Sequence, residues 1–576
     1  MNFRVKWVRR FMHSGLLAVS LLAGTPFAHG QVAAPVSAAT PAAERRPKLV
    51  VMIVVDQMRA DYVEKFRGQW SGGLKRLVDE GAWFRAAAYP YAATETCVGH
   101  STISTGALPA SHGMVANAWW DRESKDKEKG MVTCTSDPNA KNIAYAGGTA
   151  KGGDSAWRML VPSFAEELKF QTGGGTRIVT FSLKARAAIT MGGHKADAVT
   201  WLENGAWTTS SVYGSMPFVD DYARAHPVAQ DYGKTWALSL PESKYMYPHP
   251  TVGAETVEGW GPAFPHSLRG KDGASAPDSA FYRQWTTSPF ADTYLTNLAE
   301  HAVDTLGLGK GGATDYLGVS YSSPDYVGHT FGPRSWEIQD VLARLDKDLG
   351  ELLTHLDHKV GRGNYVVALT GDHGVSPIVE DLQQAGIGAP VISIPALQER
   401  IEKALEPLHV VSPAIAKMTG NDVYFASGVY GELQKNPAAM QAVKDAVMSV
   451  KGVAAVYSAD DLKDGQRSLF NPRNAAELSY YPGRSGDLYV LQQPFGEFDG
   501  DNDPVGSKKG ASHGTPYYYD QRVPILMMGF GVKHGEYFDP ATPADIAPTF
   551  AALTGITLST RDGRALSEAL TGVGSK

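Results

Sequence analysis

Acidic and imidazole side chains follow several apolar, β-branched runs of this sequence. Asp56 ends one such run, at 48–55. Asp372 and His373 directly follow another, at 365–369. Ligands of an open α/β sheet gather outside the carboxyl ends of its strands, so side chains at these ends can converge. The candidate set is three aspartates and three histidines: Asp56, Asp325, His329, Asp372, His373 and His513.

The composition of this set indicates a metal site. Oxygen and nitrogen donors together suit zinc better than magnesium or calcium, which prefer oxygen alone. Six donors exceed what one tetrahedral ion needs, so we expect two ions to share them. Asp325 and His329 are spaced so that both can reach one ion from a single helical turn or loop. A single histidine is more often an ordinary hydrogen-bonded residue, so only the whole set predicts a metal centre.

A threonine-rich stretch at 94–113 offers a hydroxyl nucleophile. Thr94 and Thr96 both lie in its opening Thr-Glu-Thr-Cys-Val-Gly-His. A threonine hydroxyl is a weak nucleophile until a base or a metal ion lowers its pKa. By itself the stretch is more typical of a capped loop than of a catalytic segment.

The apolar runs indicate the elements that must position these residues. Continuous apolar runs are typical of strands buried on both faces, as in a parallel sheet covered by helices. Between them, Ser335 caps a segment whose apolar residues follow the 3.6-residue period, and another helix is predicted at 545–553. This alternation predicts an α/β fold with a doubly wound, mostly parallel sheet sandwiched by helices. The predicted strands are 48–55, 177–181, 316–320, 365–369 and 523–528.

Two long stretches interrupt this alternation. Residues 204–288 are rich in Trp, Tyr and Pro with little periodicity, and 378–510 contain helical and strand patterns of their own. We predict one catalytic domain over 48–576 into which both stretches are inserted as cap subdomains. Caps over a site and purely structural additions both remain compatible with the sequence.

The first 30 residues predict a secretory signal peptide. Four basic residues precede a short apolar stretch at 15–23, and small residues follow it. The pair Arg9-Arg10 leaves the twin-arginine route open beside the general one. An uncleaved anchor fits less well because the apolar stretch is short. Residues 31–47 predict a disordered linker, so we expect a periplasmic or secreted protein.

Net charge limits the classes of binding partner that we expect for this chain. The net charge is −6, and cleavage would remove four basic and no acidic residues. Such an acidic chain has no electrostatic reason to bind nucleic acid or an anionic membrane broadly, and its body has no 20-residue apolar run for stable membrane association.

Cys97 and Cys134 are the only cysteines. One disulfide and two free thiols are both compatible with the sequence.

Several blocks, in order along most of the mature chain, resemble the PafA-type (phosphate-irrepressible) alkaline phosphatases of the alkaline phosphatase superfamily. The blocks are Val-Val-Asp (54–56), Thr-x-Thr-x-x-Gly-His (94–100), Ser-Leu-Lys-Ala-Arg-Ala-Ala-Ile (182–189), Pro-Asp-x-x-Gly-His (324–329), Gly-Asp-His-Gly (371–374) and Ser-His-Gly-Thr-Pro (512–516). The resemblance implies an alkaline-phosphatase-like fold and two zinc ions per chain. It implies that one ion is bound by Asp325, His329 and His513, and the other by Asp56, Asp372, His373 and the oxygen of Thr96.

The resemblance also implies the catalytic and substrate-binding residues. Thr96, rather than Thr94, is the nucleophile that forms a phosphothreonine intermediate. Asn117, Lys184 and Arg186 bind the phosphate group. A monoester presents anionic oxygens that suit an arginine fork beside a lysine, whereas a diester has an ester group in that place. We therefore expect an exported alkaline phosphatase that hydrolyses small-molecule phosphate monoesters, for which a monomer is compatible with the sequence.

Two other functions remain to be distinguished. A nucleotide pyrophosphatase or phosphodiesterase of the same superfamily would share the metal ligands and Thr96 but would not need Lys184 and Arg186. An extracytoplasmic metal-binding protein without activity is the second alternative. A sulfatase is disfavoured because Cys97-Val-Gly-His departs from the Cys-x-Pro-x-Arg type of sequence.

Overall fold

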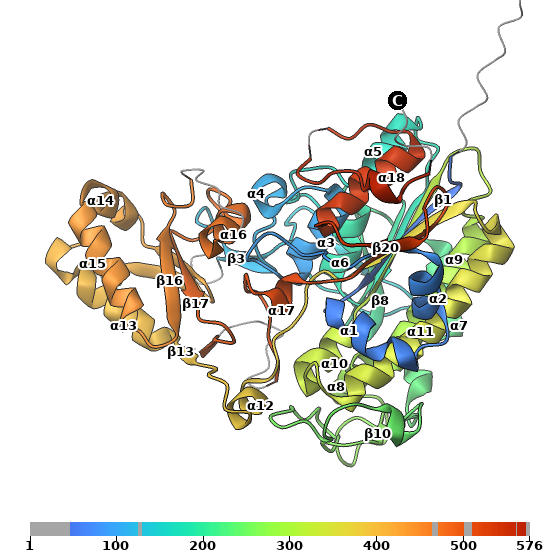
Figure 1. Cartoon of the computed structure of the whole chain (residues 1–576), viewed down its shortest axis with the longest axis horizontal. Coiled ribbons are helices and arrows are strands. Elements are labelled where there is room, and N and C mark those ends of the chain that lie inside the picture. The colour runs from blue at the N-terminus through green and yellow to red at the C-terminus, as the bar shows by residue number, and fades with distance from the viewer. Residues whose placement is uncertain (1–45, 125–129, 464–470, 500–509, 560, 572–576) are drawn as a thin grey trace, which may run out of the picture. The chain divides into compact units, whose positions relative to one another are not determined.

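The computed structural model describes residues 46–124, 130–463, 471–499, 510–559 and 561–571. Its main element is a ten-stranded sheet with helices on both faces (Figure 1). The strand order is β20-β2-β19-β12-β1-β11-β6-β7-β8-β5, and the middle strands β12 to β7 run parallel. In that order the strands are Gly535–Tyr537, Ala82–Phe84, Ile525–Gly529, Tyr365–Thr370, Leu49–Val55, Asp315–Tyr321, Ile178–Ser182, Ala198–Glu203, Ala206–Ser210 and Asn142–Ala144. The predicted fold class is confirmed.

Strand β1 explains why the central strands lack polar alternation. All seven of its residues are buried. Val51 and Ile53 belong to the apolar cluster on one face of the sheet, while Val50 and Met52 belong to the cluster on the other. Successive side chains of a strand point to opposite faces, so a strand covered on both faces must be apolar at every position.

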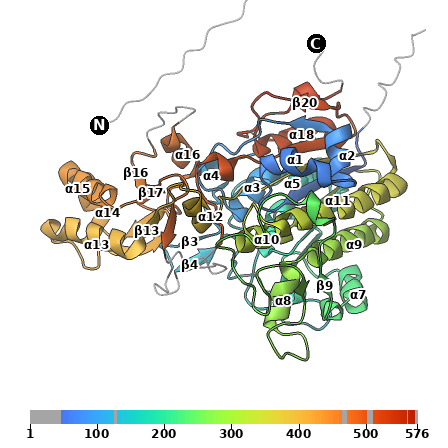
Figure 2. The ribbon, with the colours of Figure 1, turned by 60° about the horizontal axis from the view of Figure 1, so that its bottom comes forward.

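Helices form a layer on each face. Helices α2 (Gly73–Glu80), α9 (Pro289–Leu306) and α11 (Trp336–Leu356) cover one face, and Figure 2 shows α9 and α11 side by side. The other face is covered by α3 (Thr96–Thr105), α5 (Phe164–Gln171), α6 (Ala185–Gly192) and α18 (Ile546–Thr554). The predicted cap of α11 is confirmed, because the backbone N–H of Ile338 donates to Ser335 Oγ at 3.1 Å.

The two long stretches differ in structure. Residues 204–288 include β8, α7 (Pro217–Ala225), β9 (Thr235–Trp236), β10 (His266–Ser267) and α8 (Ser279–Thr286), joined by long irregular segments. Residues 378–510 contain a separate sheet in the order β14-β15-β17-β16, formed by Ile415–Thr419, Asp422–Phe425, Leu488–Gln492 and Val453–Ser458. Helices α13 (Ile394–Leu405) and α15 (Pro437–Met448) pack on this sheet with their own apolar cluster (Figure 1).

The 378–510 segment also contacts a hairpin of the main body, formed by β3 (Ala118–Trp120) and β4 (Met131–Thr133). Asp487 Oδ1 accepts a hydrogen bond from Arg122 Nη2 at 3.0 Å. Arg484 donates to Gly113 O at 2.5 Å, and its guanidinium lies 5.2 Å from the centre of the Trp119 ring. The inserted segment therefore supports the chain on both sides of this hairpin's first strand.

The predicted signal peptide, 1–30, and nearly all of the predicted linker, 31–47, lie outside the described residues. Within the described part of the chain, every helix is too short or too polar to cross a membrane.

A close helix contact gives a test of the packing. A Cβ at Gly73, in α2, would lie 2.4 Å from Leu349 C and 2.6 Å from Gly350 N of α11. We expect Gly73→Ala to destabilise the protein by ~1–3 kcal/mol, because the two helices must separate. Gly431→Ala, in α14 (Val429–Lys435), is the matched control, since no atom lies within 4 Å of its Cβ position. Thermal unfolding should show a lower midpoint for Gly73→Ala alone; equal midpoints would contradict the role of this contact.

Candidate active site

The carboxyl ends of three adjacent strands carry the candidate donors. Asp56 directly follows β1, and Asp372 and His373 follow β12. Asp325 and His329 lie one turn apart on α10 (Ser323–Phe331), which follows β11. Because β12, β1 and β11 are parallel neighbours in the sheet, these ends meet at one edge.

The first donor group consists of Asp325, His329 and His513, whose ligand atoms lie within 4.8 Å of one another. Asp325 Oδ1 is 3.2 Å from His329 Nε2 and 4.0 Å from His513 Nε2. His513 comes from the loop before β19, far along the chain. The structure therefore brings together the three residues that the resemblance assigns to one ion.

The residues predicted for the second ion lie directly against the first group. The structure groups Asp56 and His373 with Asp325, again within 4.8 Å. Asp372 lies beside them, with Oδ2 3.4 Å from His373 Nε2. The rings of His373 and His513 stack with centres 3.6 Å apart, so the two groups are contiguous. All six predicted donors therefore lie in one cluster, and Asp325 stands between its two halves.

The three imidazoles of the cluster are held in the same way, each by a backbone carbonyl at its Nδ1 atom. The Nδ1 atoms of His329, His373 and His513 lie 2.7, 2.9 and 2.8 Å from the carbonyl oxygens of Ala511, Gly374 and Thr94. A carbonyl only accepts, so each Nδ1 carries a proton, and in the neutral ring each Nε2 keeps its lone pair. These lone pairs face the carboxylates, which is the arrangement of metal-binding histidines held by a hydrogen bond at the other ring nitrogen.

The carboxylates of the cluster are buried and crowded. Burial, reinforced by the neighbouring Asp325 and Asp372, raises the pKa of Asp56 well above its usual range. Asp56 Oδ1 lacks a hydrogen-bond donor among the described residues, whereas Oδ2 lies 2.6 Å from the Lys184 ammonium. A divalent cation would relieve the repulsion and supply the partner that Oδ1 lacks, so the donor set fits a metal.

A buried lysine lies between the two halves of the cluster. Lys184, at the start of α6, places its Nζ 2.5 Å from Asp325 Oδ2 and 2.6 Å from Asp56 Oδ2. Burial lowers the pKa of Lys184, but Asp325 and Asp56 more than offset this and raise it. Arg186, one residue into the helix, has a buried Nε without a hydrogen-bond partner among the described residues. Lys184 therefore lies within the donor cluster.

Thr96 is the first residue of α3 and is 1% exposed. Its Oγ1 is 3.4 Å from His373 Nε2. Thr94, the other candidate, donates its hydroxyl to Thr515 O at 3.0 Å. The geometry therefore favours Thr96, whose oxygen also lies at the positive end of a helix.

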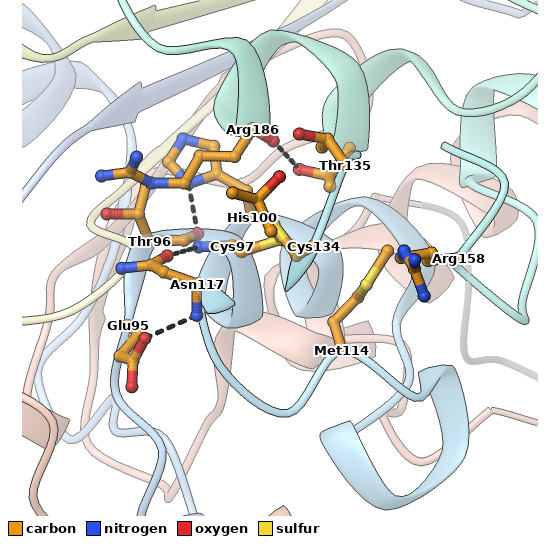
Figure 3. Close-up of a disulfide and its surroundings, with 12 residues drawn as sticks. Glu95, Thr96, Cys97, His100, Met114, Asn117, Cys134, Thr135, Arg158 and Arg186 are labelled. Atoms are coloured by element: carbon orange, nitrogen blue, oxygen red, sulfur yellow. Dashed lines mark hydrogen bonds between the residues drawn. A yellow bond between two sulfur atoms is a disulfide. The ribbon is translucent and has the colours of Figure 1, made fainter. Parts of the chain in front are cut away.

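Asn117 is held by three hydrogen bonds beside a disulfide (Figure 3). Its Oδ1 accepts from the N–H of Cys97 at 2.9 Å, so its amide nitrogen is turned away from that contact. Its own N–H donates to Glu95 at 2.6 Å, and its carbonyl accepts from Cys134 N at 2.9 Å. Of the two alternatives left by the sequence, the structure has the Cys97–Cys134 disulfide.

Figure 3 shows the Arg186 guanidinium on the same side as the side chains of Thr96 and Asn117. All the residues predicted to bind substrate therefore gather near the predicted nucleophile.

Glycines of the sequence blocks allow the segments to approach closely. A Cβ at Gly99 would lie 2.1 Å from Asp372 O, and one at Gly374 would lie 2.1 Å from Tyr519 O. A side chain at either position would push apart segments that carry the donors.

Two residues that contact the donors were not predicted as site residues from the sequence. The first is His100, whose Nδ1 lies 2.9 Å from Thr96 O and 3.2 Å from Asp372 Oδ2. Its place in Thr-x-Thr-x-x-Gly-His was the available signal. The second is Gln57, which carried no signal beyond following Asp56 directly.

Comparison with known proteins identifies the family. A sequence model described as type I phosphodiesterase / nucleotide pyrophosphatase matches residues 50–516. The chain belongs to this family, within the alkaline phosphatase superfamily.

Named relatives cover most of the chain. It is 31% identical to the alkaline phosphatase PafA of Elizabethkingia meningoseptica, over 88% of this chain and 91% of the relative. It is 32% identical to the alkaline phosphatase PhoK of Sphingomonas sp, over 90% of this chain and 89% of the relative. The crystal structure of wild-type PafA superimposes with a TM-score of 0.81 at 30% identity, covering 92% of this chain and all of PafA. The protein is accordingly a phosphatase of this superfamily.

The disulfide generates a prediction. It closes a loop with a sequence separation of 37, for which chain entropy gives a stabilisation of about 3–4 kcal/mol. A thiol titration of the unfolded, unreduced protein should find no free thiol at either cysteine. Reductant should lower the thermal midpoint of the wild type but leave the Cys97→Ala/Cys134→Ala double variant unchanged. Two titratable thiols before reduction, or an equal effect of reductant on both proteins, would contradict the disulfide.

Proposed function

We propose that this protein is an exported, metal-dependent phosphomonoesterase that uses Thr96 as its nucleophile. The observation that carries the proposal is the position of the Thr96 hydroxyl, at a helix N-terminus, 3.4 Å from His373 in a cluster of six metal-type donors. The two relatives named above, PafA and PhoK, are both called alkaline phosphatases and support the same reaction.

We propose zinc as the metal, with two ions per chain. Asp325, His329 and His513 would hold one, and Asp56, Asp372 and His373 would hold the other beside Thr96. The mixture of carboxylate oxygens and imidazole nitrogens supports zinc. Bound divalent ions supply Lewis acidity that favours the alkoxide forms of the attacking and leaving oxygens.

In this proposal Thr96 transfers the phosphoryl group in two steps. Thr96 Oγ1 forms a bond to phosphorus as the bond from phosphorus to the alcohol oxygen breaks, giving phosphothreonine. The departing alcohol takes up one proton, which balances the proton lost from the threonine hydroxyl. Water then attacks the phosphothreonine, inorganic phosphate leaves, and the hydroxyl is restored.

Lys184, Arg186 and Asn117 support a monoester as the substrate. The amide nitrogen of Asn117 is free of the Cys97 contact and can donate to a phosphate oxygen. Arg186 brings to the same site a buried N–H that has no hydrogen-bond partner in the part of the chain that the structure describes. Charge-assisted donors of this kind favour the two negative charges of a monoester over the single charge of a diester.

A nucleotide pyrophosphatase or phosphodiesterase is the second candidate, because the family description itself includes these activities. Such an enzyme would use the same six donors and Thr96, but it would gain little from the two cations. The ratio of kcat/KM for a nitrophenyl phosphate monoester to that for its methyl diester distinguishes the two. A preference for the diester would overturn the proposal.

We propose that the protein acts in the periplasm or outside the cell on small phosphate esters. The basic and apolar pattern of residues 1–30 supports export. The Cys97–Cys134 disulfide supports an oxidising compartment. The acidic net charge gives no reason to expect nucleic acid as a partner.

The nucleophile can be tested directly. Thr96→Ala should lower kcat by at least roughly 10³-fold, because the phosphothreonine cannot form. Thr96→Ser should retain more activity than the alanine variant, since it keeps a hydroxyl. Acid quenching with radiolabelled substrate should trap a phosphoprotein in the wild type only, while metal analysis shows near-normal zinc in the alanine variant. Wild-type turnover by Thr96→Ala would mean attack by Thr94 or by water.

Substrate choice can be tested at Arg186. Lys184 also contacts Asp56 and Asp325, so its loss would disturb the donors, whereas Arg186 allows a cleaner test. Arg186→Ala should lower kcat/KM for the monoester by about 10–150-fold, the range for losing a hydrogen bond to a charged group, and that for the diester by less. Arg186→Lys keeps the charge without the planar fork and should fall between. Equal losses on both substrates would contradict the assigned role.

A further inference from the structure

Gln57 adopts an unusual backbone conformation at the centre of the site. It directly follows Asp56, is 1% exposed, and has a φ of 67°. The left-handed region is unfavourable for a residue with a long side chain, and such residues cluster at sites where the surrounding structure enforces them. Contacts of Gln57 with its surroundings must therefore stabilise this conformation.

The conformation lets one residue reach the strands on both sides of β1. Its backbone N–H donates to Asp372 Oδ1, after β12, at 3.0 Å. Its side-chain Nε2 donates to Asp325 Oδ1, after β11, at 2.8 Å. Strand β1 lies between β12 and β11, so Gln57 spans the donor cluster from its middle.

Each contact fixes a carboxylate oxygen. Asp372 Oδ1 accepts from the N–H groups of both Gln57 and His373 at 3.0 Å, while Asp372 Oδ2 lies 3.2 Å from His100 Nδ1. Asp325 Oδ1 is held by Gln57 in the same way, which limits rotation of that carboxylate. Partners of this kind orient metal ligands and tune their affinity.

The helix beside Gln57 makes room for it. A Cβ at Gly328 would lie 1.8 Å from Gln57 Oε1. Gly328 is the glycine of Pro-Asp-x-x-Gly-His, between the donors Asp325 and His329. Its lack of a side chain therefore gives the Gln57 amide access to Asp325.

We propose that Gln57 is a positioning residue that sets the spacing of the two donor groups, by tying one carboxylate from each side of β1 to a single rigid point. The inference rests on the proposed function, in which these groups hold metal ions. Gln57 itself has no role as a metal ligand or in contact with substrate.

The test measures zinc affinity rather than activity. Chelator-treated protein is titrated with zinc by calorimetry, and the two sites are told apart in a His513→Ala background, which removes a donor from the Asp325 group only. Gln57→Met keeps the length of the side chain but loses its hydrogen bond. Gln57→Gly loses the same bond while permitting the left-handed backbone and the N–H contact to Asp372. Gly328→Ala displaces the Gln57 amide without changing Gln57 or any donor.

The control is a buried glutamine away from the cluster. Gln339, on α11, is fully buried and donates through Nε2 to the carbonyls of Met246 and Ser335 at 2.9 Å. Gln339→Met therefore removes comparable hydrogen bonds without touching a donor. Thermal unfolding of every variant separates a general loss of structure from a local effect.

We expect all three site variants to weaken zinc binding at the Asp325, His329 and His513 group by about 10- to 100-fold, the usual effect of losing a partner of a metal ligand. Binding at the other group should change less than about threefold, because the backbone contact to Asp372 persists. In the His513→Ala background, Gln57→Met should leave the remaining zinc affinity unchanged.

Three outcomes overturn the inference. The first is unchanged zinc affinity in folded Gln57→Met and Gln57→Gly, and the second is weakening equal to that in Gln339→Met. The third is weakening at the Asp372 group alone. If the wild type binds two zinc ions and Thr96→Ala is inactive, these results reject the role of Gln57 and leave the proposed function intact. A wild type that binds no zinc would reject both.

Discussion

Three carboxylates buried in one place form the constraint on which the rest of this structure depends. Asp56, Asp325 and Asp372 are at most 3% exposed, and burial together with its neighbours raises the pKa of Asp56. Charges removed from water are costly unless they are paired or hydrogen-bonded. The only amine in contact with two of them is that of Lys184, among the described residues. The cluster therefore favours positive charge, and the lone pairs of three oriented imidazoles favour a metal as its source.

The sheet makes this concentration of charge possible. Asp56 and Asp325 lie far apart in the sequence, yet their strands are adjacent and point the same way. Parallel strands present all their carboxyl ends at one edge, so each turn there adds a side chain to the same site. Apolar layers on both faces hold these strands rigidly, which keeps the carboxylates close despite their repulsion.

Much of this arrangement could be predicted from sequence because it follows from local patterns. The uninterrupted apolar run of β1 and the periodic apolar residues of α11 each permit only one kind of element. The donors could be predicted because they follow such runs. The contact of Asp325 with both halves of the cluster could not be predicted, since it depends on which way each carboxylate turns. The pairing of Cys97 with Cys134 likewise depends on a distance across the fold.

Gln57 was beyond sequence reasoning for a related reason. Glutamine has no special preference for a left-handed backbone, so the residue type does not predict the positive φ of Gln57 after β1. Residues 378–510 are predicted as an inserted subdomain, but the order of its sheet could not be predicted because the strands are short and partly exposed. Only their shared apolar cluster reveals that they form one body.

The contacts between the 378–510 segment and the β3–β4 hairpin have a consequence for how such a protein can diversify. The six donors lie at one edge of the central sheet, whereas Asn117 directly precedes β3. Asp487 and Arg484 of the 378–510 segment contact the residues on either side of that strand. The donor cluster and Asn117 are thus supported by different parts of the fold. Substitutions in the outer segment can therefore shift Asn117 while the donors at the edge of the central sheet keep their positions.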